Sequence, residues 1–365
     1  MTDLSLSKIF RLPEFRRSKD LSDRVGQFML ASYILFFLLF LVFPLGTLIL
    51  KSVQDQKGNF IGLKNYLIYL NEPALFQSFF NSLFIAIVST IIVVILAFSF
   101  AYALTRTCMP FKGFFRLIAL IPLLSPSILA AIALVYWFGN KGILKALLFG
   151  NSIYGPIGII MASVYWTFPH ALMILSTSLS LSDSRLYEAA EVLKTSRLRA
   201  FLTITIPGAR YGIISTTFVI FTQVFTDFGV PKVIGGNYNM LATDIYKEVV
   251  GMQNFQMGAV ISLVLLLPSL FAFFIDQYSR KKQISLLTSR SVVFNPKKSF
   301  GVDSLMLSYC VLITLIILMM IGMAQFGALV EFWPYNLSFT LKHYQFEVAG
   351  LGWESFYNSV RLAFY

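Results

Sequence analysis

Long runs of apolar residues separated by short polar segments dominate the sequence. Seven of these runs carry almost no charge, and each has the roughly 20 residues that a helix needs to cross a 30 Å hydrocarbon layer. The runs are 28–50, 79–104, 117–138, 153–181, 211–230, 255–275 and 304–330. An eighth begins at Phe356 and reaches Tyr365, which is about half of a crossing. The pattern predicts an all-α membrane protein.

A polar, helix-forming island at 188–207 lies between the fourth and fifth runs. Apolar residues recur here at i, i+3, i+4 and i+7, which places them on one face of a helix. These residues are Leu186, Ala189, Ala190 and Leu193. Ser182, Asp183 and Ser184 supply N-cap candidates just before them. A helix of this kind either lies on the bilayer surface or is presented to a soluble partner, and the pattern leaves both readings open.

Composition supports the membrane assignment. The chain is 57% hydrophobic and 13% charged, whereas soluble domains carry about 25% charged residues. The net charge of +12 is also found in nucleic-acid-binding proteins, but here the charges lie in alternate loops and form no basic stripe with stacking aromatics. Two isolated cysteines and two histidines give neither a disulfide framework nor a metal motif. We therefore predict no nucleic-acid partner, no metal and no cofactor.

The distribution of Lys and Arg between loops predicts the orientation. The N-terminal segment and the loops 105–116, 182–210 and 276–303 hold 20 of these residues, whereas the alternate loops hold 8. By the positive-inside rule, the first set lies in the cytoplasm. The island at 188–207 is then cytoplasmic, and so is the N-terminus.

The sequence also contains an internal repeat. The tetrapeptide LKNY at 63–66 recurs as LKHY at 341–344, and SFFNS at 78–82 recurs as SFYNS at 355–359. Two matches in the same order predict a duplicated module. The expected organisation is a basic N-terminus (1–27), a six-span module (28–275) with its cytoplasmic loop at 182–210, a basic linker (276–303), and the start of a second module (304–365). The chain is then expected to be a C-terminally truncated fragment.

The island resembles the cytoplasmic loop of ABC importer permeases, whose pattern is E-A-A-x-x-x-G-(x)9-I-x-L-P. Glu188, Ala189, Ala190, Ile204 and Pro207 match its spacing. The resemblance implies a six-span, type I importer-like module whose coupling helix docks on a separate ATPase subunit. The residues it assigns to this contact are Leu186, Glu188, Ala189, Ala190, Leu193, Ile204 and Pro207.

Two positions depart from the family pattern. Ile206 replaces a leucine, which is conservative, and Lys194 replaces the glycine. Because lysine does not readily adopt a positive φ, we expect Lys194 to lie in an ordinary helical or turn conformation. The sequence contains no GxxxxGK[ST] phosphate loop, so ATP hydrolysis is expected in another subunit and the chain is not expected to be an enzyme.

Four further segments resemble the 2-aminoethylphosphonate importer permeases, which are double-length relatives of ferric-iron permeases. These segments are 208–212, 226–239, 241–246 and 253–255. The resemblance implies a bacterial inner-membrane permease that receives a phosphonate from a periplasmic binding protein, with ferric iron as the alternative substrate. It also implies a second permease module, either in a missing C-terminal part or in another chain.

Two sites near the predicted outer surface have open roles. Thr226 and the acidic Asp227 lie at the end of a span, where a carboxylate contacts a translocation pathway or caps the following turn. The loop Gly235, Gly236, Asn237 and Tyr238 is a docking surface for the binding protein or a plain turn. Rival classes are a membrane enzyme, for which the sequence offers no HExxH motif, and a membrane scaffold that uses the same island to hold a partner.

Overall fold

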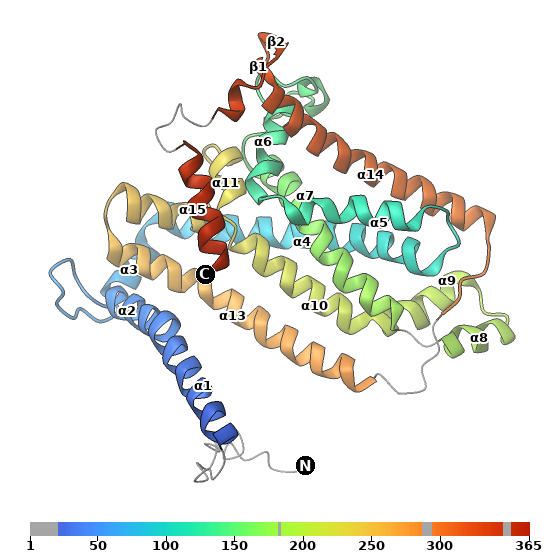
Figure 1. The fold of residues 1–365 in the computed structure, drawn as a ribbon, viewed down its shortest axis with the longest axis horizontal. Coiled ribbons are helices and arrows are strands. Elements are labelled where there is room, and N and C mark those ends of the chain that lie inside the picture. Colours follow the sequence, from blue (N-terminus) through green and yellow to red (C-terminus); the bar gives the residue numbers. More distant parts are fainter. Residues whose placement is uncertain (1–20, 182–183, 287–293, 346–351) are drawn as a thin grey trace.

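The predicted all-α membrane fold is confirmed by the structure, a computed structural model that describes residues 21–181, 184–286, 294–345 and 352–365 (Figure 1). Within these ranges, six helices are long and apolar enough to cross a membrane, or seven if one bent pair is counted as a span. The long elements are α1 (Leu21–Phe37) and α2 (Phe43–Ser52), joined by the π-helical turn Leu38–Val42, and α4 (Pro73–Arg106), α7 (Pro156–Ser180), α10 (Ile206–Phe225), α13 (Phe255–Leu286) and α14 (Phe300–Leu329).

The core lies among α4, α7, α10 and α13. Helix α4 packs along α7, and α10 packs against all three of the others. Small residues permit the close approach that helix association in membranes relies on. A Cβ added to Gly212 of α10 would lie 2.2 Å from the Ser178 hydroxyl of α7, so no larger residue fits there. Helices α7 and α10 are therefore in tight contact.

The third predicted span, 117–138, is sharply bent. The chain forms α5 (Lys112–Leu120), a 3-10 turn (Ile121–Leu124) and α6 (Ser127–Phe138), and the two halves are bent by 102°. Pro122 and Pro126 lie at the break. Proline has no N–H to donate and its ring clashes with the preceding turn, so a straight helix cannot pass through both positions.

The predicted fifth span, 211–230, begins and ends too late. One helical span runs from Arg197 to Phe225. It comprises α9 (Arg197–Ala200), a π-helical turn (Phe201–Thr205) and α10. The π-helical turn directly precedes Pro207 and accommodates the residue without a break. The second half of the polar island is therefore the first part of this span.

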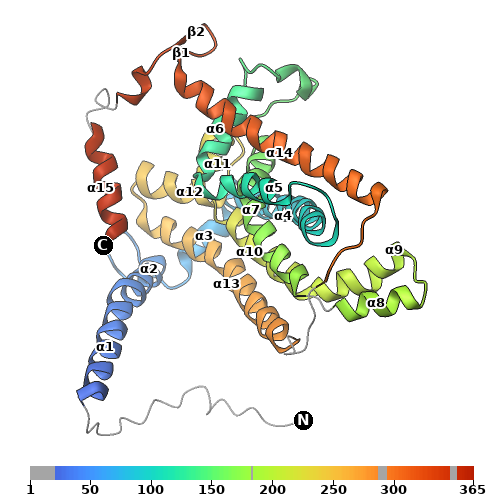
Figure 2. The same cartoon turned by 45° about the vertical axis from the view of Figure 1, so that its right-hand side comes forward.

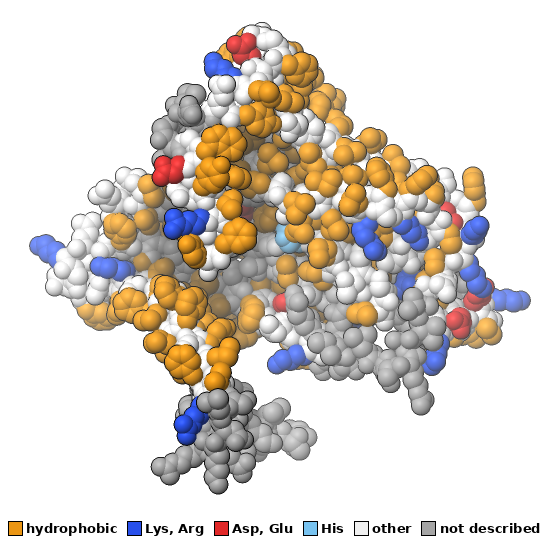
Figure 3. All heavy atoms as spheres, viewed as in Figure 1, with side chains coloured by type: hydrophobic (Ala, Val, Ile, Leu, Met, Phe, Trp, Pro, Cys, Tyr) orange, Lys and Arg blue, Asp and Glu red, His pale blue; other side chains and the backbone are white. Residues whose placement is uncertain are grey.

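Shorter elements cover the two ends of the bundle. One end carries α8 (Ser184–Val192) and α9. The other carries α3 (Lys64–Asn71), α11 (Gly229–Ile234), α12 (Leu241–Tyr246), the turns Lys145–Leu148, Lys247–Gly251 and Lys342–Tyr344, and the antiparallel hairpin β1 (Val330–Phe332) and β2 (Asn336–Phe339). Charged side chains gather toward these ends, whereas the middle of the visible face is mainly hydrophobic (Figure 3).

Helix α1 stands apart from the bundle in both ribbon views, and α15 stands apart in Figure 2 (Figures 1 and 2). Helix α1 projects away, and the most apolar window of its span has no buried residue. Helix α15 (Gly352–Phe364) carries the second copy of the repeated motif, with Ser355 and Ser359 exposed. In the first copy, Ser78 and Ser82 of α4 are fully buried. The second module remains a prediction.

Candidate functional site

The helix predicted around Glu188 is α8. Figure 2 shows it lying beside α9, beyond the end of the bundle. Two of the three N-cap candidates, Ser182 and Asp183, lie outside the described residues. The third, Ser184, is the first residue of α8, and its hydroxyl donates to the Glu188 carboxylate at 3.1 Å.

The end of α8 overturns the expectation for Lys194, which has a positive φ of 49°. The Lys194 N–H donates to the Glu191 carbonyl at 2.9 Å, and the Thr195 N–H donates to the Ala190 carbonyl at 2.9 Å. These two bonds are the Schellman motif, which ends a helix with one left-handed residue. The turn toward α9 requires this conformation whatever the side chain, and a non-glycine residue adopts it at a cost of about 1 kcal/mol.

The predicted coupling residues of α8 divide between two environments. Ala190 is 8% exposed and faces the protein. Leu186 and Leu193 are 55% and 77% exposed, and Glu188 and Ala189 are also exposed. Apolar side chains grouped around a carboxylate on an outward surface are typical of a protein contact site.

Ile204 and Pro207 lie outside α8, in the span that follows. Ile204 is half-buried in the π-helical turn, and Pro207 is exposed in the first turn of α10. The buried Thr205 between them connects the two elements, because its hydroxyl lies 3.0 Å from the hydroxyl of Tyr187 on α8. The island is thus one exposed helix resting on the start of the next span.

A cluster around Arg106 was missed by the sequence analysis, which counted this arginine as one of three basic residues in a loop. It is the last residue of α4 and only 8% exposed. Its Nη2 donates to the Leu179 carbonyl of α7 at 2.6 Å. Its guanidinium carbon lies 5.0 Å from the Tyr187 ring centre and 4.4 Å from that of Phe294. The position of Arg106 at the end of a long apolar run is the signal that could have drawn attention to it.

The segment Phe294–Ser299, which precedes α14, also contacts the island. Lys297 forms an ion pair with Glu191 at 2.5 Å, and the Arg197 guanidinium donates to the Ser299 hydroxyl at 2.5 Å. A cavity of about 580 Å³ lies between this segment, α8 and α9. The last part of the predicted linker 276–303, from Phe294 to Ser299, therefore contacts the island.

At the other end of the same span, Asp227 caps a helix. Its carboxylate accepts bonds from the Gly229 and Val230 N–H groups at 3.3 and 3.1 Å, which begin α11. It also accepts a bond from the Ser127 hydroxyl at the start of α6, at 2.9 Å. Thr226 is half-buried and bonds the Thr222 carbonyl of α10. This geometry is that of the structural cap, one of the two roles the sequence left open.

The loop Gly235, Gly236, Asn237 and Tyr238 lines a cavity of about 490 Å³ together with residues 152 and 154–156. Gly236 and Asn237 are exposed, and Gly236 has a positive φ of 58°. The loop is anchored below by the Gly155 N–H, which donates to the Ile234 carbonyl at 2.8 Å. The predicted docking loop therefore forms part of the wall of an open recess.

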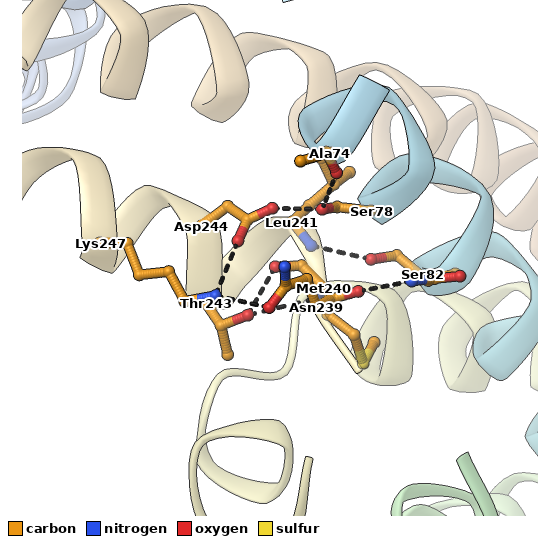
Figure 4. A network of polar contacts seen from close by, with 10 residues as sticks. Ala74, Ser78, Ser82, Asn239, Met240, Leu241, Thr243, Asp244 and Lys247 are labelled. Atoms are coloured by element: carbon orange, nitrogen blue, oxygen red, sulfur yellow. Dashed lines mark hydrogen bonds and ion pairs between the residues drawn. The ribbon is translucent and has the colours of Figure 1, made fainter. Parts of the chain in front are cut away.

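A buried network around Asp244 fixes this end of the molecule (Figure 4). Asp244 of α12 is 4% exposed, accepts a bond from the Ser78 hydroxyl of α4, and pairs with Lys247 at 3.4 Å. The Ser82 hydroxyl accepts a bond from the Leu241 N–H at 2.9 Å. Two segments noted in the sequence for separate reasons, the repeated motif at 78–82 and the segment 241–246, therefore meet here.

The site thus combines a mostly helical membrane protein with a short exposed helix between two consecutive spans. Residues 109–285 match the family of binding-protein-dependent transport system inner membrane components. The matched segment contains α8 and the spans on either side of it. This part of the chain is therefore similar to the membrane permease components of ABC importers.

Two relatives illustrate the range of this family. The chain is 25% identical over 338 residues to a ferric transport system permease protein of Actinobacillus pleuropneumoniae, which covers 86% of this chain and 47% of the relative. It is 24% identical over 274 residues to a spermidine/putrescine transport system permease protein PotC homolog of Mycoplasma genitalium, covering 71% of this chain and 94% of that protein. The chain thus spans about half the length of the ferric relative.

A solved structure shares the fold. The bacterial alginate ABC transporter, solved in complex with an alginate pentasaccharide-bound periplasmic protein, contains a chain that aligns with a TM-score of 0.58 and 14% identity. The alignment covers 74% of the present chain and 97% of that one. The six-span permease fold is therefore confirmed.

Proposed function

We propose that this chain is the permease subunit of an ATP-driven importer and that α8 is the helix on which a separate ATPase subunit docks. One observation carries the proposal: the exposed Glu188-Ala189 turn of α8 lies between two consecutive spans and ends in a Schellman motif at Lys194. Helix α8 ends in a tight turn and is mostly exposed. Its outer face is therefore accessible to a soluble partner.

The charge distribution supports the orientation. The end that carries α8 and α9 also carries the basic linker, so we place it in the cytoplasm and the Asp244 end outside. The N-terminus is then cytoplasmic, in a bacterial inner membrane. The recess formed by Gly235, Gly236, Asn237 and Tyr238 faces outward in this arrangement, and we assign it to the periplasmic binding protein.

A complete translocation pathway is expected to need a second module. The ferric relative is about twice as long as this chain, and the repeated motif at 355–359 would belong to the first part of that module. We therefore expect the second half in further sequence or in another chain. Thr226 and Asp227 would lie beside the outer mouth of the pathway. Asp227 would contribute by holding the start of α11 in place.

The charge at Glu188 gives the central test. Because this side chain is exposed, Glu188→Lys in the full-length protein should leave membrane insertion intact and remove its pairing with a basic group of the ATPase. In proteoliposomes that contain ATPase and binding protein, we expect solute uptake per ATP hydrolysed to fall by roughly tenfold or more.

Glu72→Lys is the matched control. Glu72 is also an exposed carboxylate, but it lies just before the first residue of α4, at the end of the bundle away from α8. This variant should retain normal coupling. Normal uptake by Glu188→Lys would overturn the assignment of α8. Stable binding of an ATPase without nucleotide-dependent uptake by the unmodified protein would favour the scaffold instead.

We propose two candidate substrates, a phosphonate and ferric iron. The segments 208–212 and 226–239 support 2-aminoethylphosphonate or a related phosphonate, whereas the ferric relative supports iron. Among the described residues, no group of three or more His, Cys, Asp or Glu side chains is arranged to hold a metal ion. The predictions that the chain binds no metal and no cofactor stay untested.

Calorimetry on the cognate binding protein would separate the candidates, because this protein supplies selectivity in such importers. Titration with 2-aminoethylphosphonate should give saturable heat, and ferric iron presented as a citrate complex should give none. The reverse result would replace phosphonate with iron. A spermidine titration serves as the third arm, since a polyamine permease homolog is also among the relatives.

A further inference from the structure

Helix α8 has few buried contacts of its own. Among its described residues, only Ser184 and Ala190 are buried. Four of the residues proposed to meet the ATPase are exposed: Leu186, Glu188, Ala189 and Leu193. The position of α8 relative to the spans therefore depends on a limited set of contacts, which include those made by the half-buried Tyr187.

The Arg106 guanidinium connects Tyr187 to two spans at once. Arg106 ends α4, and its Nη2 donates to the carbonyl of Leu179, in the last turn of α7, at 2.6 Å. A cation at the C-terminus of a helix is favoured by the partial negative charge of the free carbonyls there. The same group lies against the Tyr187 ring, 5.0 Å from its centre.

Phe294 completes the cluster from the linker side. Its ring centre lies 4.4 Å from the guanidinium carbon and 4.6 Å from the Tyr187 ring centre. Arg106 is 8% exposed, so the charge is largely removed from water. Cation–π contacts are strongest under this condition, because water no longer competes for the cation.

We propose that Arg106 is the positioning residue of α8, fixing this helix to the ends of α4 and α7 through Tyr187 and Phe294. The consequence for transport rests on the proposed function: a movement of these two spans is carried to α8 and thereby to the ATPase. The contact itself does not depend on any partner.

The planarity of the guanidinium matters for this role. A planar guanidinium can stack on aromatic rings while its edge donates to a carbonyl, whereas a lysine ammonium is a compact, strongly hydrated charge. Arg106→Lys therefore keeps the charge and loses the shape. Phe294→Leu keeps an apolar side chain and loses the ring, without changing α4.

Hydrogen exchange of the full chain in lipid nanodiscs tests the contact directly. For Arg106→Lys we expect exchange within 184–192 to accelerate by roughly tenfold or more, with α7 and α10 unchanged. Phe294→Leu should accelerate the same peptide by a smaller factor. Arg116→Lys, an exposed arginine on α5, is the matched control and should change nothing.

Unchanged exchange within 184–192 in both variants would overturn the proposal. A rise over the whole molecule in Arg106→Lys, together with no change in Phe294→Leu, would also overturn it, because the arginine would then serve the fold in general. None of these outcomes depends on an ATPase, so failure of the proposed function is recognised separately, by the absence of ATPase binding to the unmodified chain.

A coupling measurement separates positioning from mere stability. With ATPase and binding protein present, Arg106→Lys should hydrolyse more ATP per solute imported, while the amount of assembled complex stays the same. Arg116→Lys should keep the original ratio. An unchanged ratio in Arg106→Lys, despite faster exchange in α8, would refute the positioning role in transport.

Discussion

The two ends of the bundle each carry short helices and carboxylates, but they attach them differently. At the Asp244 end, Asp244 is 4% exposed and bonds a serine of α4 and a lysine of its own segment. At the α8 end, Glu188 is exposed, and Glu191 pairs with Lys297 while both side chains are more than half exposed. Similar residue types therefore form a buried anchor at one end and a surface contact at the other.

The difference in burial between these carboxylates predicts a difference in how much each contributes to stability. Removing a partner from a buried charge leaves an uncompensated group in a medium of low polarity, which is strongly unfavourable. An exposed pair is replaced by water with little change in free energy. The exposed carboxylates of α8 therefore contribute little to holding that end in place, whereas the buried Asp244 holds its end to α4.

The largest effect is expected from removing the buried anchor. Asp244→Ala removes the charged acceptor of the buried Ser78 hydroxyl and one of the two partners of Lys247, and the loss of these two charge-assisted bonds should lower the free energy of unfolding by about 3 kcal/mol. Thermal unfolding in detergent measures this loss. Asp55→Ala removes a carboxylate that bonds only its own turn and should change stability by less than about 1 kcal/mol; equal losses would contradict the comparison.

A second substitution at the same end should have a moderate effect. Ser82→Ala removes the acceptor of the buried Leu241 N–H, and a loss of about 1–2 kcal/mol follows from leaving that donor unpaired. Ser99→Ala on the same helix is the control, since its hydroxyl only donates back to the Ile95 carbonyl. The comparison of the two melting temperatures isolates the contact with α12.

At the α8 end, one substitution should stabilise. Lys194→Gly removes the steric strain of a positive φ and should gain about 1 kcal/mol in local stability. Slower hydrogen exchange of the Lys194 and Thr195 amides is the expected readout. Leu193→Gly, one residue earlier and without a positive φ, should give no gain. A gain there of equal size would mean that chain flexibility, and not strain, is responsible.

The smallest effect is expected for the exposed ion pair. Glu191→Gln should change the free energy of unfolding by less than about 0.5 kcal/mol, because both partners are exposed. Any difference should shrink further as salt is added, since surface charges are screened. Thermal unfolding at low and high ionic strength tests this. A loss as large as that of Asp244→Ala would remove the distinction between the two ends.

The apolar runs predicted the spans well because a helix that crosses a bilayer must be long and uncharged. Placing a charged side chain in the hydrocarbon layer costs free energy. Breaks were harder to predict. The prolines at 122 and 126 signal a kink, but the 102° angle depends on how the two halves pack. The start of the fifth span was misplaced because the stretch from Arg197 to Pro207 is polar enough to resemble a loop, although it continues the helix beyond the apolar layer.

The candidate site was predictable in part. The Glu188-Ala189-Ala190 spacing identified the exposed helix, because periodicity and local turn chemistry are encoded within a few residues. Residue type misled at Lys194, where the need to end the helix outweighed the preference of the side chain. The contact between Arg106 and Phe294 joins residues 188 positions apart and depends on tertiary packing alone.

The close contact of Gly212 with Ser178 has a mechanical consequence. Because Gly212 has no Cβ, helix α10 approaches α7 closely at this crossing, and a larger residue there would push the two helices apart. The helix from Arg197 to Phe225 is about 44 Å long at 1.5 Å per residue. It reaches from the end of α8 to the cap at Asp227. A tilt of this helix by a few degrees would therefore displace its far end by several ångströms.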